Sequence, residues 1–434
     1  MKSKQILEFK KSNIGKIPAN WDVKKLCEIM TTTLRHGIYK SKEFVNPNGV
    51  KILKMGTLDS TNWIGEQNME RFSINDEELK RHRIYEGNII FARTSMMTGG
   101  LGNCGIVMKH SEPVIFDGNL LCAELNTDLI LPIFCLYYFK SHYGQNEISR
   151  MTGGTQSRSI PSSELSNVHV LLPSKSEQSK ISKILFDLDF QIENLQKQNK
   201  TLTQIPQLIY KSWFVNYDGH VEFKDSELGQ IPKKWKVEKL ANFLELTKGV
   251  SYKSKELMTS NKALVTLKSI NRGGGYSERG LKSFNGKFNE NQIVLQDDII
   301  IAQTDLTQNA EVIGKPALIR NSKDFDILIA SLDLLIVRPK NENISKSYLY
   351  HLFMTDEFQN HIYGYTSGTT VLHLAKDGVP NYHFVLPSKD ILEKFDKSIL
   401  SIMKKNRDNN YQIHSLKKTR DILLPKLMSG EIRV

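Results

Sequence analysis

The sequence predicts an α+β protein with two similar globular halves, each a mixed β-sheet with helices, separated by two long antiparallel coiled-coil helices. An internal repeat spans each half, and a coiled-coil pattern follows each half. The last residues fall near the position where the repeat would start again. We therefore expect a pseudo-twofold, cyclic arrangement in which the N-terminal residues lie near the last helix. The predicted segments are 1–171 (N-terminal segment and first globular half), 172–215 (first long helix), 216–385 (hinge and second globular half) and 386–434 (second long helix).

The repeat has a constant offset. The motif Gly-x-Ile-Pro-x-x-Trp starts at Gly15 and again at Gly229, 214 residues later. The tetrapeptide Leu-Pro-Ser-Lys starts at Leu172 and returns at Leu386 with the same offset. This period is far longer than that of a solenoid protein, so it indicates a duplicated domain that carries its own helix.

Each half ends in a long amphipathic pattern in which apolar residues recur at steps of three and four, typical of a coiled coil. Pairing the two helices within the chain would bury both stripes. Asn199 in the first helix and Asn406 and Asn409 in the second occupy positions where leucine or isoleucine would be more stabilising, so they either fix the register or lie in a splayed, hydrated part of the pair. Pro206 is expected to kink or end the first helix. The predicted seam consists of Leu185, Leu188, Ile192, Leu195, Asn199 and Leu202 in the first helix, and Ile399, Ile402, Asn406, Ile413 and Leu416 in the second.

Short β-rich runs bounded by Gly, Asn and Pro predict the strands of the globular halves. Two amphipathic segments with aromatic faces, 133–140 and 346–355, predict helices whose tyrosines pack in the core rather than stack on bases. The strands predicted in the first half are 51–55, 88–91, 104–108, 119–125 and 167–172.

The composition favours a polyanionic partner, because the formal net charge is +12 and the isoelectric point is near 9.2. The four cysteines form no CxxC motif, which argues against a zinc site or a disulfide framework. The N-terminus has no apolar signal-peptide core, and the most apolar run, 328–337, is too short to cross a membrane. We therefore expect a cytoplasmic protein.

These features together resemble the specificity (S) subunits of type I restriction-modification systems. The resemblance rests on the repeated opening motif, the Leu-Pro step into each long helix, and the run Leu-Leu-Pro-Lys-Leu-Met-Ser-Gly-Glu-Ile that begins at Leu423. It implies that each half is a target-recognition domain that reads one part of a bipartite, interrupted site in double-stranded DNA. It also implies helices that set the spacer and dock two methyltransferase (M) subunits, with S-adenosylmethionine on those subunits and restriction (R) subunits for cleavage.

Comparing the two halves divides their polar residues into candidates for phosphate contact and candidates for base reading. Matching lysines beside tyrosines would contact phosphates, unless they lie in a solvated loop. Segments that differ between the halves and are rich in Arg, Gln, Asn and Thr are candidates for reading base edges in the major groove. The phosphate candidates are Tyr39, Lys40, Lys42, Lys54, Tyr252, Lys253, Lys255 and Lys268. The base-reading candidates are Arg93, Thr94, Ser95, Thr98, Gln156, Ser157, Arg158, Gln303, Thr304, Gln308, Asn309, Thr370 and His373.

The sequence contains no methyltransferase motif and no P-loop, so we predict no catalytic residue, metal or cofactor in this chain. Two other functions remain open at this point. A self-sufficient, metal-dependent nuclease would use Asp218, Glu222 and Lys224 in the hinge. A coiled-coil DNA-binding repressor would need no enzyme partner.

Overall fold

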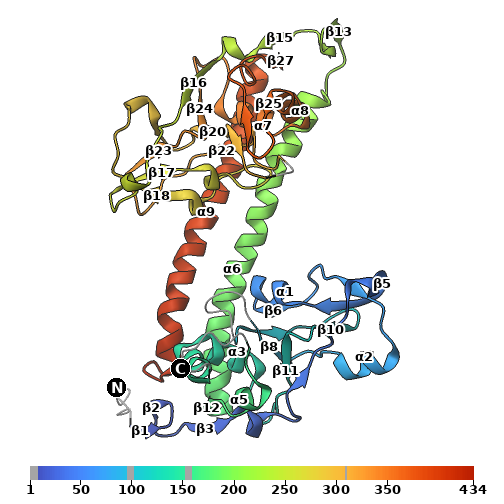
Figure 1. The fold of residues 1–434 in the computed structure, drawn as a ribbon, viewed down its shortest axis with the longest axis vertical. Coiled ribbons are helices and arrows are strands. Elements are labelled where there is room, and N and C mark those ends of the chain that lie inside the picture. Colours follow the sequence, from blue (N-terminus) through green and yellow to red (C-terminus); the bar gives the residue numbers. More distant parts are fainter. Residues whose placement is uncertain (1–7, 95–101, 152–158, 308–309) are drawn as a thin grey trace. The chain divides into compact units, whose positions relative to one another are not determined.

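The computed structural model describes residues 8–94, 102–151, 159–307 and 310–434. The chain forms two compact units: unit 1 takes residues up to Leu195 and from Tyr411 onward, and unit 2 takes Gln196–Asn410 (Figure 1). Each unit therefore contains one globular half and one end of each long helix. The long helices are α6 (Lys175–Tyr210), which continues into a π-helical turn at Lys211–Val215, and α9 (Lys389–Met428).

The globular half of unit 1 is built on a five-stranded sheet with the order β4-β11-β8-β9-β6 and a three-stranded sheet with the order β10-β5-β7. All five predicted strands and the predicted helix are present, although β5 begins earlier than expected, at Val45. The elements are β1 (Phe9–Ser12), β2 (Gly15–Pro18), β3 (Asp22–Lys25), β4 (Arg35–His36), β5 (Val45–Leu53), α1 (Met55–Ser60), β6 (Trp63–Ile64), β7 (Arg71–Phe72), α2 (Asp76–His82), β8 (Ile89–Ala92), β9 (Cys104–Val107), β10 (Val114–Phe116), β11 (Leu120–Ala123), α3 (Pro132–Lys140), α4 (His142–Met151), α5 (Ser162–Ser166) and β12 (His169–Leu172).

Unit 2 has two four-stranded sheets, with the orders β16-β24-β20-β22 and β18-β17-β23-β19, and a small sheet with the order β21-β26-β25. The second predicted helix is present as α7. The elements are β13 (Phe223–Ser226), β14 (Gly229–Pro232), β15 (Lys236–Lys239), β16 (Leu244–Lys248), β17 (Lys262–Val265), β18 (Leu281–Ser283), β19 (Ile293–Val294), β20 (Ile299–Ala302), β21 (Thr304–Asp305), β22 (Pro316–Leu318), β23 (Ile327–Ala330), β24 (Leu334–Pro339), α7 (Lys346–Phe353), α8 (Asp356–Gly364), β25 (Thr366–Ser367), β26 (Leu372–Leu374) and β27 (His383–Leu386).

The duplication predicted from the sequence is visible in the pairing of strands. In unit 1 the strand after the opening motif, β3, pairs antiparallel with β12, and in unit 2 β15 pairs with β27 in the corresponding register. Trp235 lies in the core of unit 2 with its ring centroid 5.9 Å from that of Phe214, at the end of α6. In unit 1 Trp21 shares the core with Met428, the last residue of α9. The cyclic arrangement is therefore confirmed, because the end of each long helix packs beside the opening motif of a half.

The helices α6 and α9 pair antiparallel within each unit. In unit 2, Asn199 contacts Asn410, whereas Thr203, one turn further along α6, contacts Asn406, one turn earlier along α9. Of the two outcomes expected for Pro206, a kink or the end of the first helix, the second was wrong, since α6 continues to Tyr210 with Pro206 inside it. Every predicted seam residue is at least half-buried: Leu185, Ile192, Ile399 and Ile413 are buried, and Leu188, Leu195, Asn199, Leu202, Ile402, Asn406 and Leu416 are half-buried.

Asparagines of both helices form a hydrogen-bonded cluster in unit 2. The side chain of Asn199 accepts from Asn409 Nδ2 at 2.9 Å and donates to Asn410 Oδ1 at 3.1 Å. Asn406 Nδ2 donates to the carbonyl oxygen of Asn199 at 3.3 Å. Asn409 is fully buried, so the cluster is not splayed or hydrated there. This geometry favours the alternative in which asparagines fix the register of the pair.

A buried histidine connects α7 to α6 in unit 2. His351 is 5% exposed, and its Nδ1 lies 2.9 Å from Gln207 Oε1. Burial lowers the pKa of His351 to about 3. The unfolded chain therefore binds more protons than the folded chain between about pH 3 and the ordinary histidine value of about 6.5. The contribution of neutral His351 to stability is fully present above that value and is lost as the pH falls.

We predict that a His351→Gln variant loses less stability than the original chain on acidification from pH 7 to pH 4.5. Below about pH 6 the difference in free energy of unfolding between the two proteins should change by about 1.4 kcal/mol for each pH unit. Urea unfolding followed by tryptophan fluorescence at several pH values measures it. Parallel pH profiles for the two proteins would contradict the prediction.

Candidate nucleic-acid interface

In unit 2 the two segments proposed to read bases lie in one small sheet. Thr304 on β21 pairs with His373 on β26, and Ser367 on β25 pairs with His373 from the other side. The side chains of His373 and Thr370 are exposed. Thr304 is half-buried, and its hydroxyl donates to Asp333 Oδ1 at 3.0 Å. His373 and Thr370 are therefore the described candidates of this half that are free to contact a ligand.

Two polar side chains in or next to β21 stabilise the fold and are not free to contact a ligand. Gln303, a base-reading candidate, is only 8% exposed, and its amide donates to the carbonyl of Leu332 at 3.4 Å. Gln303 is therefore not available to read a base, contrary to the prediction from the sequence. Asp305 is fully buried; burial alone would raise its pKa, but hydrogen bonds from the backbone of Thr307, Val312 and Ile313 outweigh this effect and lower the pKa. The carboxylate of Asp305 thus holds the loop that follows β21.

The first half brings the corresponding segments together in the same way. The backbone N–H of Ile160 donates to the carbonyl of Arg93 at 2.8 Å, as Leu374 donates to Gln303 at 2.9 Å in unit 2. Thr94 forms a β-bridge with Ser159, and its hydroxyl donates to Asn119 Oδ1 at 3.3 Å. The remaining candidates, Ser95, Thr98, Gln156, Ser157, Arg158, Gln308 and Asn309, lie outside the described residues.

The lysines proposed to contact phosphates fall into two groups. Lys40 is largely covered and forms an ion pair with Glu78 at 2.7 Å, and Lys54 forms an ion pair with Glu70. A lysine with a carboxylate partner must give up that partner to bind a phosphate, so these two are weaker candidates. Among the described residues, the exposed lysines of this set that have no ion-pair partner are Lys42, Lys253, Lys255 and Lys268.

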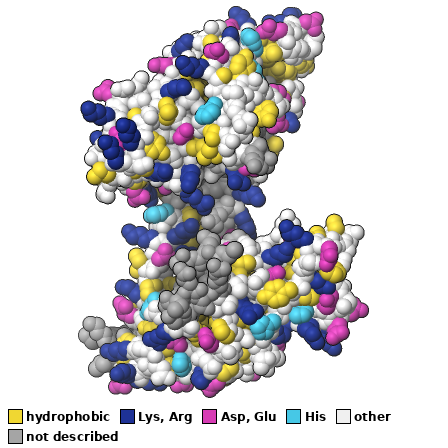
Figure 2. Space-filling view, viewed as in Figure 1, with side chains coloured by type: hydrophobic (Ala, Val, Ile, Leu, Met, Phe, Trp, Pro, Cys, Tyr) yellow, Lys and Arg dark blue, Asp and Glu magenta, His cyan; other side chains and the backbone are white. Residues whose placement is uncertain are grey.

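The two matching tyrosines differ in exposure. Tyr39 is 65% exposed and packs against Gly118, where an added Cβ would lie 2.5 Å from the ring. Tyr252 is half-buried against Val250 and Phe284. On the face shown in Figure 2, lysine and arginine side chains gather on the side of unit 2 that carries β17, β18 and β23.

Comparison with known proteins identifies the family. A family model described as the type I restriction modification DNA specificity domain matches residues 18–204 and again residues 232–422. The chain belongs to this family. The resemblance inferred from the sequence is confirmed, and the two globular halves are its target-recognition domains.

Individual relatives match this specificity-family chain over most of their length. The specificity subunit of type I restriction enzyme MjaIX from Methanocaldococcus jannaschii is 26% identical over 98% of this chain and 97% of its own length. The HindI specificity subunit from Haemophilus influenzae is 24% identical over 80% of this chain and 87% of its own. The crystal structure of a type I restriction-modification S subunit from M. genitalium has a TM-score of 0.56 at 16% identity and covers 98% of this chain and 99% of that chain, which shows a shared fold.

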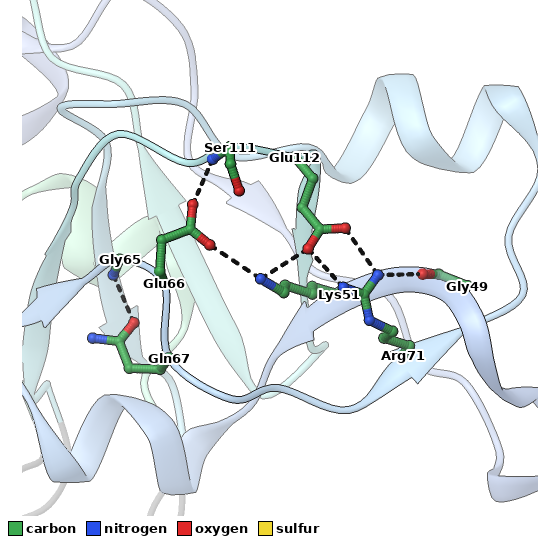
Figure 3. Close-up of polar contacts among 8 residues, drawn as sticks. All are labelled: Gly49, Lys51, Gly65, Glu66, Gln67, Arg71, Ser111 and Glu112. Carbon is green, nitrogen blue, oxygen red and sulfur yellow. Dashed lines mark hydrogen bonds and ion pairs between the residues drawn. The ribbon is translucent and has the colours of Figure 1, made fainter.

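The first target-recognition domain contains an ion-pair cluster that the sequence analysis missed. Lys51 on β5 lies between two carboxylates, with Nζ 3.1 Å from Glu66 and 2.8 Å from Glu112 (Figure 3). Arg71 on β7 donates to both oxygens of Glu112, at 2.6 and 2.9 Å. Hydrogen bonds from Ser111 and Lys51 lower the pKa of Glu66 to about 2, and those from Arg71 and Lys51 lower that of Glu112 to about 2. The cluster joins β5 and β7 to the loop before β10.

In the hinge, two of the nuclease candidates pair with other side chains. Asp218 accepts a hydrogen bond from Ser212 at 2.7 Å, whereas Glu222 pairs with Lys233 at 3.3 Å. Within the described ranges, no group of three or more His, Cys, Asp and Glu side chains is placed to hold a metal ion. All four cysteines are unpaired. In the same part of the chain, no helix is long and apolar enough to cross a membrane.

Proposed function

We propose that this chain is the non-catalytic DNA-specificity subunit of a type I restriction-modification complex, in which each target-recognition domain reads one part of a bipartite, interrupted site. The helices α6 and α9 set the spacer and dock two methyltransferase subunits, which bind S-adenosylmethionine. Restriction subunits join the complex for cleavage. The recognised partner is double-stranded DNA.

One observation carries this proposal. In both halves, two segments whose side chains differ between the halves lie side by side. In each half, the end of a buried strand (β8 or β20) meets a second segment through the same backbone hydrogen bond, Ile160 to Arg93 or Leu374 to Gln303. The backbone is shared, but the side chains presented there differ between the halves. A common scaffold that carries different donors and acceptors is what two readers of different base sequences require.

Base-resolution methylation mapping tests the proposal. DNA would be prepared from a naive host that expresses this chain with the methyltransferase encoded beside it, and from a control host that lacks only this chain. We expect an interrupted motif that is methylated on both strands only when this chain is present. A methyltransferase complex that co-purifies with the chain and leaves the DNA unmethylated would contradict the proposal.

A further inference from the structure

Unit 2 has a small cavity beside the sheet formed by β21, β26 and β25, with a volume of about 230 Å³. Its wall is mainly apolar and includes Leu246, Leu335 and Leu374. Two lysines, Lys248 and Lys376, also line it, together with the buried amide of Gln303. The cavity therefore combines an apolar interior with positive charge.

The two lysines come from different elements and have free ammonium groups. Lys248 is the last residue of β16, and Lys376 lies two residues beyond β26. Both are exposed, and the described part of the chain provides no carboxylate partner for either. A ligand that suits them would carry two negative charges separated by an apolar group. A strand of DNA offers such an arrangement, because each deoxyribose, whose C–H groups can cover an apolar wall, lies between two phosphates.

The same position in unit 1 carries a histidine and an arginine. His36 on β4 pairs with Leu121 on β11, as Lys248 on β16 pairs with Leu335 on β24. Arg93 lies where Gln303 lies, as the matching backbone hydrogen bonds show. Arg93 Nε is buried and has no hydrogen-bond partner in the described structure. Each half thus has a cation near this position, Lys248 in unit 2 and Arg93 in unit 1, and binding the DNA backbone is a task that both halves would share.

We infer that this cavity anchors one DNA strand, with Lys248 and Lys376 each binding one of two consecutive phosphates and the deoxyribose between them covering the apolar wall. The inference rests on the proposed function and deepens it, because it names the backbone contact next to the segment that reads bases. Contacts of this kind fix the register of a protein on the duplex without selecting a sequence.

The test compares the full chain, in complex with its methyltransferase, with a Lys248→Ala/Lys376→Ala variant and a Lys236→Ala control. Lys236 is an exposed lysine on β15 of the same unit, outside the cavity. DNA affinity is measured at several salt concentrations on a duplex that carries the methylated motif. Losing two phosphate contacts should make the slope of log affinity against log salt less steep by about 1.8, since each contact contributes about 0.9. The control should keep the original slope.

Ethylation of single phosphates locates the contact. The original complex should lose binding when either of two consecutive phosphates in one half-site is ethylated, and the double variant should be insensitive at both. A Lys248→Arg/Lys376→Arg variant should retain the salt slope, and the methylated motif should be the same in all variants. An unchanged slope and unchanged ethylation pattern in a folded double alanine variant would overturn the inference alone. Absence of DNA binding by the original complex would overturn the proposed function as well.

Discussion

Replacing Thr370 and His373 together with alanine should relax the recognised sequence in one half-site and leave the other half-site unchanged. Both side chains are exposed, and neither belongs to the core of unit 2. A specific contact to a base edge contributes about 1–3 kcal/mol of discrimination, which corresponds to a factor of roughly 5 to 150. Methylation mapping should therefore show additional bases at one or two positions of a single half-site.

Three further variants serve as comparisons for this prediction. His383→Ala removes an exposed histidine from β27 of the same unit and should leave the motif intact. Lys253→Ala removes an exposed phosphate candidate and should weaken binding to all sequences alike. Arg158→Ala should relax the other half-site. A Thr370→Ala/His373→Ala variant that methylates the original motif without additional bases would show that this sheet does not read the bases.

The architecture could be predicted because the sequence contains an internal repeat. The offset of 214 residues between the two copies of the opening motif also separates Lys175 and Lys389, the first residues of α6 and α9. The alternation of three- and four-residue steps then identified which face of each helix is buried. Both features are properties of sequence spacing, which local geometry translates directly into structure.

The site was predicted less well because the exposure of a polar side chain depends on distant residues. Gln303 has the side chain of a base-reading residue, but Leu332, in the turn between β23 and β24, supplies a carbonyl acceptor for its amide, and Gln303 is buried. Lys40 meets Glu78, 38 positions away, and Lys54 meets Glu70, 16 positions away. No periodicity links such partners, so composition alone suggested free cations where the structure has ion pairs.

The largest loss of stability is expected from an Arg420→Ala variant. Arg420 on α9 donates to Asp189 Oδ1 on α6 at 2.8 Å, and Tyr137 on α3 donates to Asp189 Oδ2 at 2.8 Å. Asp189 is only 7% exposed, so removing the arginine leaves a buried carboxylate without its cation. Such a change costs about 3–5 kcal/mol at a fully buried pair. Because the Arg420 side chain is 26% exposed, we expect a loss of about 2–3 kcal/mol in unit 1.

Thermal unfolding of the full chain measures this loss, which should lower the melting temperature of unit 1 on the order of 5–10 °C. The matched control is Lys183→Ala, which breaks an exposed ion pair with Asp187 on the same helix and should cost less than about 0.5 kcal/mol. An Asp189→Leu/Arg420→Leu/Tyr137→Phe variant removes all three polar groups together. It should recover most of the lost stability, because the cost lies in the unpaired charge and not in the absence of the ion pair. If Arg420→Ala costs no more than the control, solvent reaches Asp189, and hydrophobic packing alone holds α6, α9 and α3 together at this end.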